Sequence, residues 1–288
     1  MNGLDHIAET FAGRRAQGNA ALMPYFTLGY PTVEISLNVI EALAGAGADL
    51  IELGIPFSDP LADGPVIQRS TQMALEQGVS VCRCLEMTAE LRRRGVRQPL
   101  LLMGYINPIL AFGVERFAAE ARAAGADGLI IPDLPPEEAG EAEAACRENG
   151  LALVYLVSPT STPERIAMLA RRTSGFLYLV SLTGVTGARD RLSEGLADFV
   201  GRVRKAAHTP LAVGFGISTP AQARAVAQTA DGVIIGSALI QAAGGAADPP
   251  RAAASFLDAI RQALSDGGGL LAKNPAAAER PSPRSPAG

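Results

Sequence analysis

The sequence is poor in the residues that form covalent cross-links and metal centres. Its 288 residues include three cysteines and two histidines. Cys82 and Cys84 are separated by one residue and Cys146 stands alone, so no pair has metal-ligand spacing. An odd number of cysteines without such spacing is typical of reduced thiols in a cytosolic protein. With His6 and His208 as the only histidines, the sequence predicts no metal site.

Long apolar runs and clustered charge are also missing. No apolar segment approaches the roughly 20 residues that a helix needs to cross a bilayer. The N-terminus lacks the charged-then-apolar layout of a signal peptide. The formal net charge is −4, and the one basic run, Arg92 to Arg94, is typical of a solvated helix end. We therefore expect a cytoplasmic protein that binds neither nucleic acid nor membranes.

Hydrophobic residues are abundant and regularly ordered. They make up 48% of the chain, against 19% charged residues, so a large core can form. Short apolar segments alternate with helical patterns, which is typical of parallel βαβ units. The expected strands are residues 20–29, 49–57, 99–105, 128–132, 153–157, 176–182, 211–215 and 232–235. The expected helices are residues 33–44, 66–77, 82–94, 114–124, 136–149, 163–172, 194–207, 220–229 and 251–265.

Eight such units in about 250 residues predict an α/β protein, a single (β/α)8 TIM barrel over residues 1–266 with extra helices. A doubly wound open sheet is the alternative, but it would more often show a glycine-rich turn after the first strand. Here that strand ends "TLGYP", which is no dinucleotide-binding fingerprint. Residues 267–288 are rich in Gly, Ala, Pro and Ser, and we expect a disordered C-terminal tail there.

A weak internal repeat accompanies the strands. The segments "AGADLIELG", "AGADGLIIPD" and "TADGVIIGS" each place a small residue and an aspartate just before a strand. That position lies at the N-terminal face of a barrel, away from its active site. We therefore expect Asp49, Asp127 and Asp231 to be turn or cap residues.

Glu52 is a carboxylate inside an apolar strand. Leu50, Glu52 and Gly54 share one strand face, which would point toward the barrel axis. An unpaired buried charge is strongly unfavourable, and burial raises the pKa of a carboxyl group. A raised pKa suits a proton donor or shuttle near neutral pH. The alternative is a structural glutamate that is hydrogen-bonded to the backbone or to water.

Asp63 lies in the loop after the same strand, eleven residues beyond Glu52. A loop acid can close over a ligand that an axial glutamate approaches from below. Two carboxylates on different supports can hold different pKa values and take different roles. Position alone nevertheless favours a simple turn at Asp63 and Gly64, and more strongly at Asp59, which precedes a proline.

Three glycine clusters follow consecutive late strands. They are "SLTGVTGARD" at 181–190, "GFGIS" at 214–218 and "IGSALI" at 235–240. Glycines let backbone N–H groups approach an anion, and a short helix starting at "GSALI" would point its N-terminus at a phosphate. Late loops with a short extra helix are the usual phosphate site of this fold.

Three tyrosines lie in or at the end of predicted strands: Tyr25, Tyr105 and Tyr178. Core packing is one interpretation of them. In the other, together they wall a site for a flat aromatic substrate with a phosphate tail.

The motifs together resemble the tryptophan synthase alpha chain family. The resemblance runs in order from about Met1 to about Leu264, through "ELGIPFSDPLADGPVIQ", "MGYINPI", "PDLPPEEA", "LVSPTS", "SLTGVTGAR" and "VGFGIS". It implies a barrel lyase that cleaves indole-3-glycerol phosphate to indole and glyceraldehyde 3-phosphate by a retro-aldol reaction. In some members a basic residue and a different small residue precede the "GVTG".

The resemblance also implies roles for individual residues. Glu52 and Asp63 match the catalytic pair, with Glu52 moving protons and Asp63 binding the indole N–H. Tyr105 and Tyr178 match substrate-pocket positions, and Thr186 matches a mobile loop that closes toward Asp63. The implied phosphate contacts are Gly187, Gly216, Gly236 and Ser237.

The resemblance implies a β-chain partner that carries pyridoxal phosphate, usually in an α2β2 heterotetramer, with loops 56–65 and 104–112 facing that partner. It implies no metal or cofactor in this chain. One alternative is a non-catalytic or weakly active barrel that mainly activates a β chain. A further alternative is another phosphate-binding barrel enzyme, such as an isomerase or the preceding indole-forming synthase. That synthase would have a catalytic lysine at a strand end, and it is disfavoured because the only lysines are Lys205 and Lys273, in a helix and in the tail.

Overall fold

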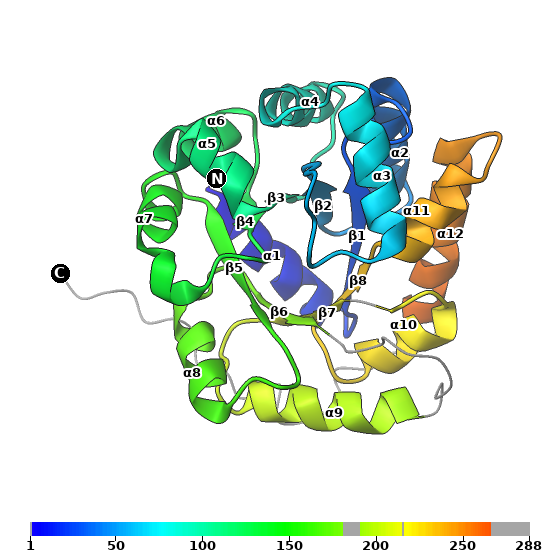
Figure 1. The fold of residues 1–288 in the computed structure, drawn as a ribbon. Helices are drawn as coiled ribbons and strands as arrows, with labels where there is room; N and C mark the ends of the chain where they lie inside the picture. The colour runs from blue at the N-terminus through cyan, green and yellow to red at the C-terminus, as the bar shows by residue number, and fades with distance from the viewer. Residues whose placement is uncertain (1, 181–190, 215, 266–288) are drawn as a thin grey trace.

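Eight parallel strands close into a barrel in the order β1 to β8, and helices surround it (Figure 1). The computed structural model describes residues 2–180, 191–214 and 216–265. The strands are β1 (Ala21–Thr27), β2 (Ile51–Gly54), β3 (Leu100–Met103), β4 (Gly128–Ile130), β5 (Ala152–Val157), β6 (Leu177–Val180), β7 (Leu211–Gly214) and β8 (Gly232–Ile235). The predicted (β/α)8 barrel is confirmed, and each expected strand is present. The expected tail lies outside the described residues.

The helices are α1 (Gly3–Ala16), α2 (Val33–Gly45), α3 (Pro65–Glu76), α4 (Val81–Arg93), α5 (Ile106–Phe112), α6 (Val114–Ala123), α7 (Gly140–Glu148), α8 (Pro163–Arg172), α9 (Arg191–Arg204), α10 (Pro220–Ala227), α11 (Ser237–Gly244) and α12 (Pro249–Ser265). Within the described ranges, no helix is both long and apolar enough to span a bilayer.

The expected helix over residues 136–149 is divided in two. A short 3-10 helix, η1 (Pro136–Glu138), precedes α7. Pro135 and Pro136 have no amide hydrogens, and the chain tightens instead through bonds from the Glu138 and Ala139 amides to the two proline carbonyls.

Helices α1 and α5 were not among the expected helices. Helix α1 buries a narrow stripe, Ile7 and Phe11, and its other side chains are mostly polar. In α5, Pro108 resembles a helix breaker, but it lies within the first turn, where proline is tolerated.

The repeated aspartates cap strands. Each aspartate lies just before one strand in the sequence but caps the start of the neighbouring strand that comes before it in the barrel. The amides of Leu22, Leu100 and Leu211 donate to the carboxylates of Asp49, Asp127 and Asp231, at 2.7, 2.9 and 2.8 Å. In each case the aspartate amide donates back to the carbonyl of the same leucine. Before β6, Ser174 makes the same pair of bonds with Leu153. Each even-numbered strand is thereby tied at its start to the odd-numbered strand before it.

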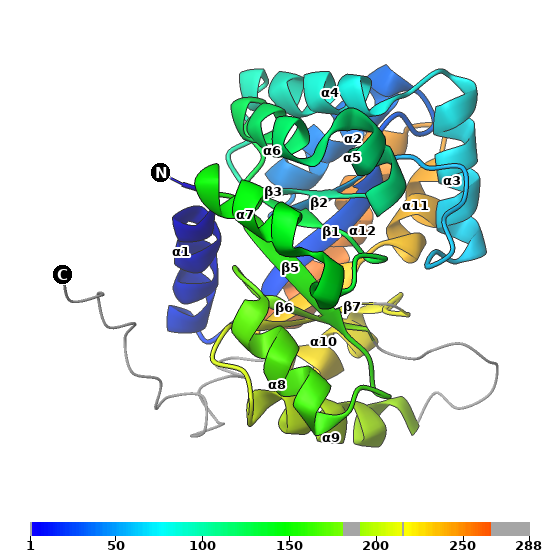
Figure 2. The same cartoon turned by 60° about the vertical axis from the view of Figure 1, so that its left-hand side comes forward.

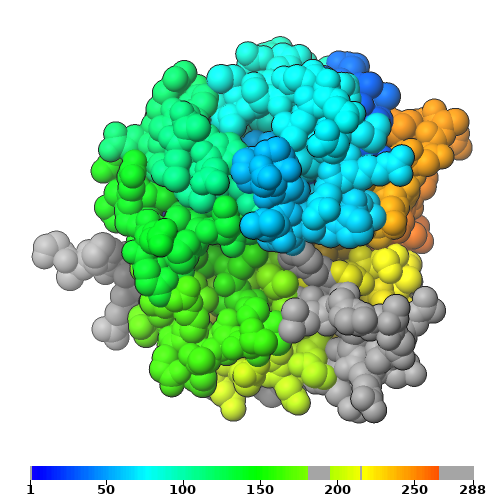
Figure 3. All heavy atoms as spheres, viewed as in Figure 1, coloured from blue at the N-terminus to red at the C-terminus, as the bar shows by residue number. Residues whose placement is uncertain are grey.

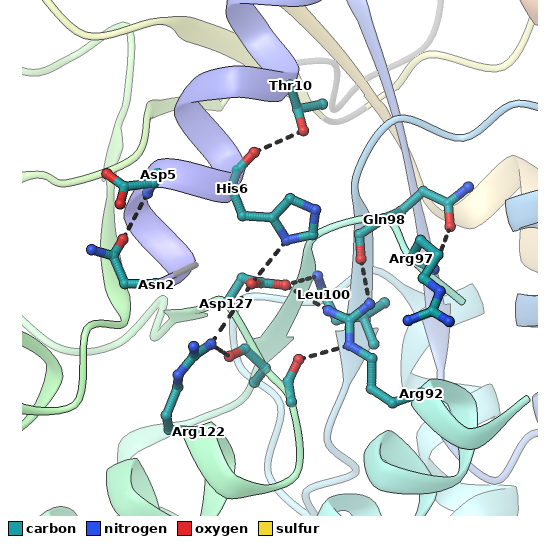
Figure 4. A network of polar contacts seen from close by, with 12 residues as sticks. Asn2, Asp5, His6, Thr10, Arg92, Arg97, Gln98, Leu100, Arg122 and Asp127 are labelled. Carbon is teal, nitrogen blue, oxygen red and sulfur yellow. Dashed lines mark hydrogen bonds and ion pairs between the residues drawn. The ribbon is translucent and has the colours of Figure 1, made fainter. Parts of the chain in front are cut away.

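The same aspartates hold α1 across the N-terminal end of the barrel. His6 contacts Asp127 through Nδ1 at 3.0 Å, and Arg14 and Arg15 pair with Asp49 and Asp231. Figure 4 shows the first of these contacts, in which Asp127 also pairs with Arg92. In Figure 2 α1 lies at one end of the barrel and the loop between β2 and α3 lies at the other. The aspartates therefore do more than the expected turns: they are buried anchors for a helix.

Candidate active site

Strand β2 holds Glu52 inside the barrel. The strand is buried along its whole length, and its register places Glu52 beside Tyr25 of β1 and Leu101 of β3. Neither carboxyl oxygen has a hydrogen-bond partner among the described residues. Removal from water disfavours the charged form and raises the pKa of Glu52 to about 8. Glu52 is therefore the buried axial acid that the strand pattern predicted, and no backbone or side-chain group among the described residues bonds its carboxyl oxygens.

Asp63 stands on a tight loop between β2 and α3. The Asp63 amide donates to the Pro60 carbonyl, so this residue does close a turn, as its position suggested. Helix α3 begins just beyond it, with Pro65 in the first turn, and the Gln68 side chain donates to the Asp63 carbonyl at 2.9 Å. In Figure 3 this segment lies on the face of the molecule that is turned toward the viewer.

Tyr105 binds the Asp63 side chain and its loop together. The Tyr105 hydroxyl donates to Asp63 Oδ2 at 3.0 Å and accepts from the Ala62 amide at 2.9 Å. Burial raises the pKa of Asp63 to about 6, and the bond from Tyr105 opposes that rise. The two acids therefore differ in support and in pKa, as two distinct acid–base roles require.

A cavity of about 240 Å³ brings the predicted site residues together. It is lined by seven of them: Tyr25, Glu52, Asp63, Tyr178, Gly216, Gly236 and Ser237. Tyr105 touches the cavity only through Asp63. Thr186 and Gly187 lie outside the described residues.

One side of the cavity is built from backbone. Gly236 is the N-cap residue of α11, and because glycine has no side chain it leaves the first N–H groups of that helix without a capping side chain of its own. The helix N-terminus carries partial positive charge and open donors, which suits an anion. Gly216 has φ +76°, a conformation that favours glycine.

Two other glycines make room for the tyrosines. A Cβ atom on Gly54 would collide with the Tyr25 hydroxyl, and one on Gly214 would collide with the Tyr178 hydroxyl. Burial raises the pKa of both phenols well above the usual range, so both remain protonated. The cavity also has lining residues that the sequence did not predict. They are Ile67 of α3, Met103 of β3 and Gln241 of α11. The sequence signal for Gly54 was its place on the same strand face as Glu52.

In the part of the chain that the structure describes, no group of three or more His, Cys, Asp or Glu side chains is placed so that it could bind a metal ion. The three cysteines carry free thiols, and those of Cys84 and Cys146 are buried.

A closed (β/α)8 barrel in which two acids, two tyrosines and a helix N-terminus line one cavity is an architecture typical of barrel enzymes. The chain matches the family model for the tryptophan synthase alpha chain over residues 11–267. The chain therefore belongs to the tryptophan synthase alpha chain family, the family that the motifs resembled, and is a lyase subunit of tryptophan biosynthesis.

Individual relatives agree with this assignment. The tryptophan synthase alpha chain of Chloroflexus aggregans is 55% identical over 237 residues, which cover 82% of this chain and 89% of the relative. The structure of Mycobacterium tuberculosis tryptophan synthase matches with a TM-score of 0.83 and 40% identity, covering 90% and 98% of the two chains. Tryptophan synthase subunit alpha from Legionella pneumophila matches with a TM-score of 0.85 and 40% identity, covering 92% and 99%.

Proposed function

We propose that this chain cleaves indole-3-glycerol phosphate to indole and glyceraldehyde 3-phosphate. The observation that carries the proposal is the pairing of Glu52 and Asp63 in one cavity, with pKa values raised to about 8 and about 6. At neutral pH the first acid is protonated and the second is ionised. A retro-aldol cleavage of this substrate needs one proton donor and one stabilising anion.

Glu52 moves the protons in the proposed reaction. Its acid form protonates indole C3, which leaves positive charge on the ring nitrogen. The resulting carboxylate then takes the proton from the glycerol hydroxyl next to the ring. The bond between C3 and the glycerol carbon breaks, its electron pair returns to the ring, and the hydroxyl carbon becomes the aldehyde. General acid–base help of this kind is typically worth ~10²–10⁴-fold.

Asp63 stabilises the charged ring. Its ionised carboxylate accepts a hydrogen bond from the indole N–H and offsets the positive charge that forms there. The Tyr105 hydroxyl, which donates to Asp63 Oδ2, keeps the carboxylate in that orientation. The phosphate of the substrate binds at the start of α11, where Gly236, Ser237 and Gly216 line the cavity.

Membership of the family implies a β-chain partner, and we propose an α2β2 assembly in which the β chain carries the pyridoxal phosphate. Among the described residues, two large hydrophobic side chains are strongly exposed, Leu61 at 95% and Leu110 at 54%. They lie on the β2–α3 loop and on α5, which the Ala62–Tyr105 bond joins. Exposed apolar side chains next to a site are typical of a protein interface.

An assay of indole release, with and without an added β chain, tests the proposal. Wild-type protein should form indole and glyceraldehyde 3-phosphate in equal amounts. Glu52→Gln should lower turnover at least about 10²-fold, because an amide can neither donate nor accept the reacting proton. Stimulation of a β chain without any cleavage would instead indicate a barrel that only activates its partner.

A further inference from the structure

A chain of buried hydroxyl groups connects the cavity wall to the first turn of α3. Tyr25 and Thr27 lie on the same face of β1, and Ser70 faces them from α3. The Tyr25 and Thr27 hydroxyl oxygens are 3.4 Å apart, and those of Thr27 and Ser70 are 2.7 Å apart. Ser70 Oγ lies 2.8 Å from the carbonyl of Ile67, which also lines the cavity.

The direction of every bond in this chain follows from its far end. A carbonyl can only accept a hydrogen bond, so the Ser70 hydroxyl donates its single proton to the Ile67 carbonyl. The proton between Thr27 and Ser70 must then come from Thr27. By the same reasoning, the proton between Tyr25 and Thr27 comes from Tyr25.

This order leaves the Tyr25 oxygen able only to accept a hydrogen bond from the cavity. The phenol stays protonated, because burial first and the nearby Asp63 second raise its pKa far above neutral. Its oxygen lies over Gly54, on the same strand as Glu52. Tyr25 is the register partner of Glu52, and both line the cavity. The proposed mechanism brings Glu52 to a glycerol hydroxyl, and the hydroxyls of that chain are hydrogen-bond donors.

We propose that Thr27 and Ser70 are positioning residues: they orient the Tyr25 hydroxyl so that its oxygen accepts a hydrogen bond from a hydroxyl of the substrate's glycerol chain. The inference rests on the proposed cleavage of indole-3-glycerol phosphate. Thr27 and Ser70 are almost completely buried and touch no substrate atom themselves. Their effect on catalysis passes through Tyr25.

The test is a double-mutant cycle on indole release. Thr27→Val keeps the shape of the side chain and removes its hydroxyl, so the Tyr25 proton is free to turn toward the cavity. We expect kcat/KM to fall about threefold to tenfold, the size of one hydrogen bond. Thr27→Ser should retain wild-type kcat/KM, and Ser70→Ala should reproduce the loss in part. In a Tyr25→Phe background, Thr27→Val should cause no further loss, because its effect needs the phenol oxygen.

Thr88→Val is the matched control. Thr88 is equally buried, but its hydroxyl donates to the Cys84 carbonyl within α4, away from the cavity. Thr88→Val should lower the melting temperature about as much as Thr27→Val does, and it should leave kcat/KM unchanged. Two results would overturn this inference without affecting the proposed function. One is wild-type kcat/KM in Thr27→Val, and the other is an equal loss from Thr27→Val with and without the Tyr25 hydroxyl. Absence of cleavage by the wild-type protein would overturn the proposed function and this inference with it.

Discussion

The two acids of the cavity differ in their surroundings, and this difference predicts the pH dependence of the enzyme. Burial raises the pKa of Glu52 to about 8, and that of Asp63 to about 6 against the bond from Tyr105. The proposed mechanism needs Glu52 protonated and Asp63 ionised. We therefore expect kcat/KM, which reports the free enzyme, to rise through about pH 6 and to fall through about pH 8. A profile of indole release without an alkaline limb would contradict the role given to Glu52.

Glu52 also links stability to pH. Its pKa is raised in the folded state from 4.5 to about 8, so between these values the folded protein holds a proton that the unfolded chain has lost. Stability from this group is complete below about pH 4.5 and is lost as pH rises through about 8. Glu52→Gln should therefore be more stable than wild type in urea above pH 8, by a few kcal/mol at most, and equally stable in acid.

Tyr105→Phe isolates the hydrogen bond that lowers the Asp63 pKa. Without that donor the Asp63 pKa rises further, so the acid limb of the kcat/KM profile should move above pH 6 while the alkaline limb stays near 8. Tyr155→Phe is a matched control, since the Tyr155 hydroxyl donates to the Glu143 carboxylate outside the cavity. An acid limb that does not move would assign it to another group, such as the substrate phosphate.

At the scale of elements, helix α1 depends on three buried carboxylates for its place. Asp127 is 4% exposed and is shared by His6 of α1, Arg92 of α4 and the amide of Leu100 at the start of β3 (Figure 4). Such a group connects a helix, a neighbouring helix and a strand. The free energy of unfolding should therefore respond to it more than to any exposed ion pair.

Asp127→Ala should lower the free energy of unfolding by about 3 kcal/mol, because it leaves buried donors without their acceptor. The proposed catalytic acids lie at the other end of the barrel, so indole release at low temperature should be nearly unchanged. Urea denaturation measures the first effect. Glu86→Ala breaks an exposed pair with Arg83 and serves as the control, with an expected change within about 0.5 kcal/mol. Equal effects of the two variants would refute the anchoring role of Asp127.

For the whole molecule, the exposed leucines predict where the β chain binds. Leu110→Glu places a charge on the apolar surface of α5 and should weaken binding of the β chain about tenfold or more. Indole release by the isolated chain should not change. Ala259→Glu, on the exposed side of α12, is the control with the same added charge. Titration calorimetry with a β chain would contradict this surface if both variants bound as wild type does.

The architecture of this protein and the buried, axial position of Glu52 could both be predicted from the amino-acid sequence. Alternating apolar strands and helices are local patterns, and a carboxylate on the inner face of a buried strand follows from strand geometry alone. The two helices that were not predicted also have local explanations. In α5, Pro108 resembles a helix breaker, and in α1 only a narrow stripe of an otherwise mostly polar segment is buried.

Contacts between residues far apart in the sequence could not be predicted and are visible only in the folded protein. Asp63 looked like a turn residue until the fold brought Tyr105, 42 residues away, to its carboxylate. The aspartates of the repeat do cap strands, but spacing gave no sign that they also bind α1, from up to 216 residues away. Such contacts depend on how strands and helices close around one core. Neither the spacing of residues along the chain nor the composition tells which distant side chains come into contact. The shared cavity of Glu52, Asp63 and Gly236 is a product of barrel closure, which carries β8 back to β1.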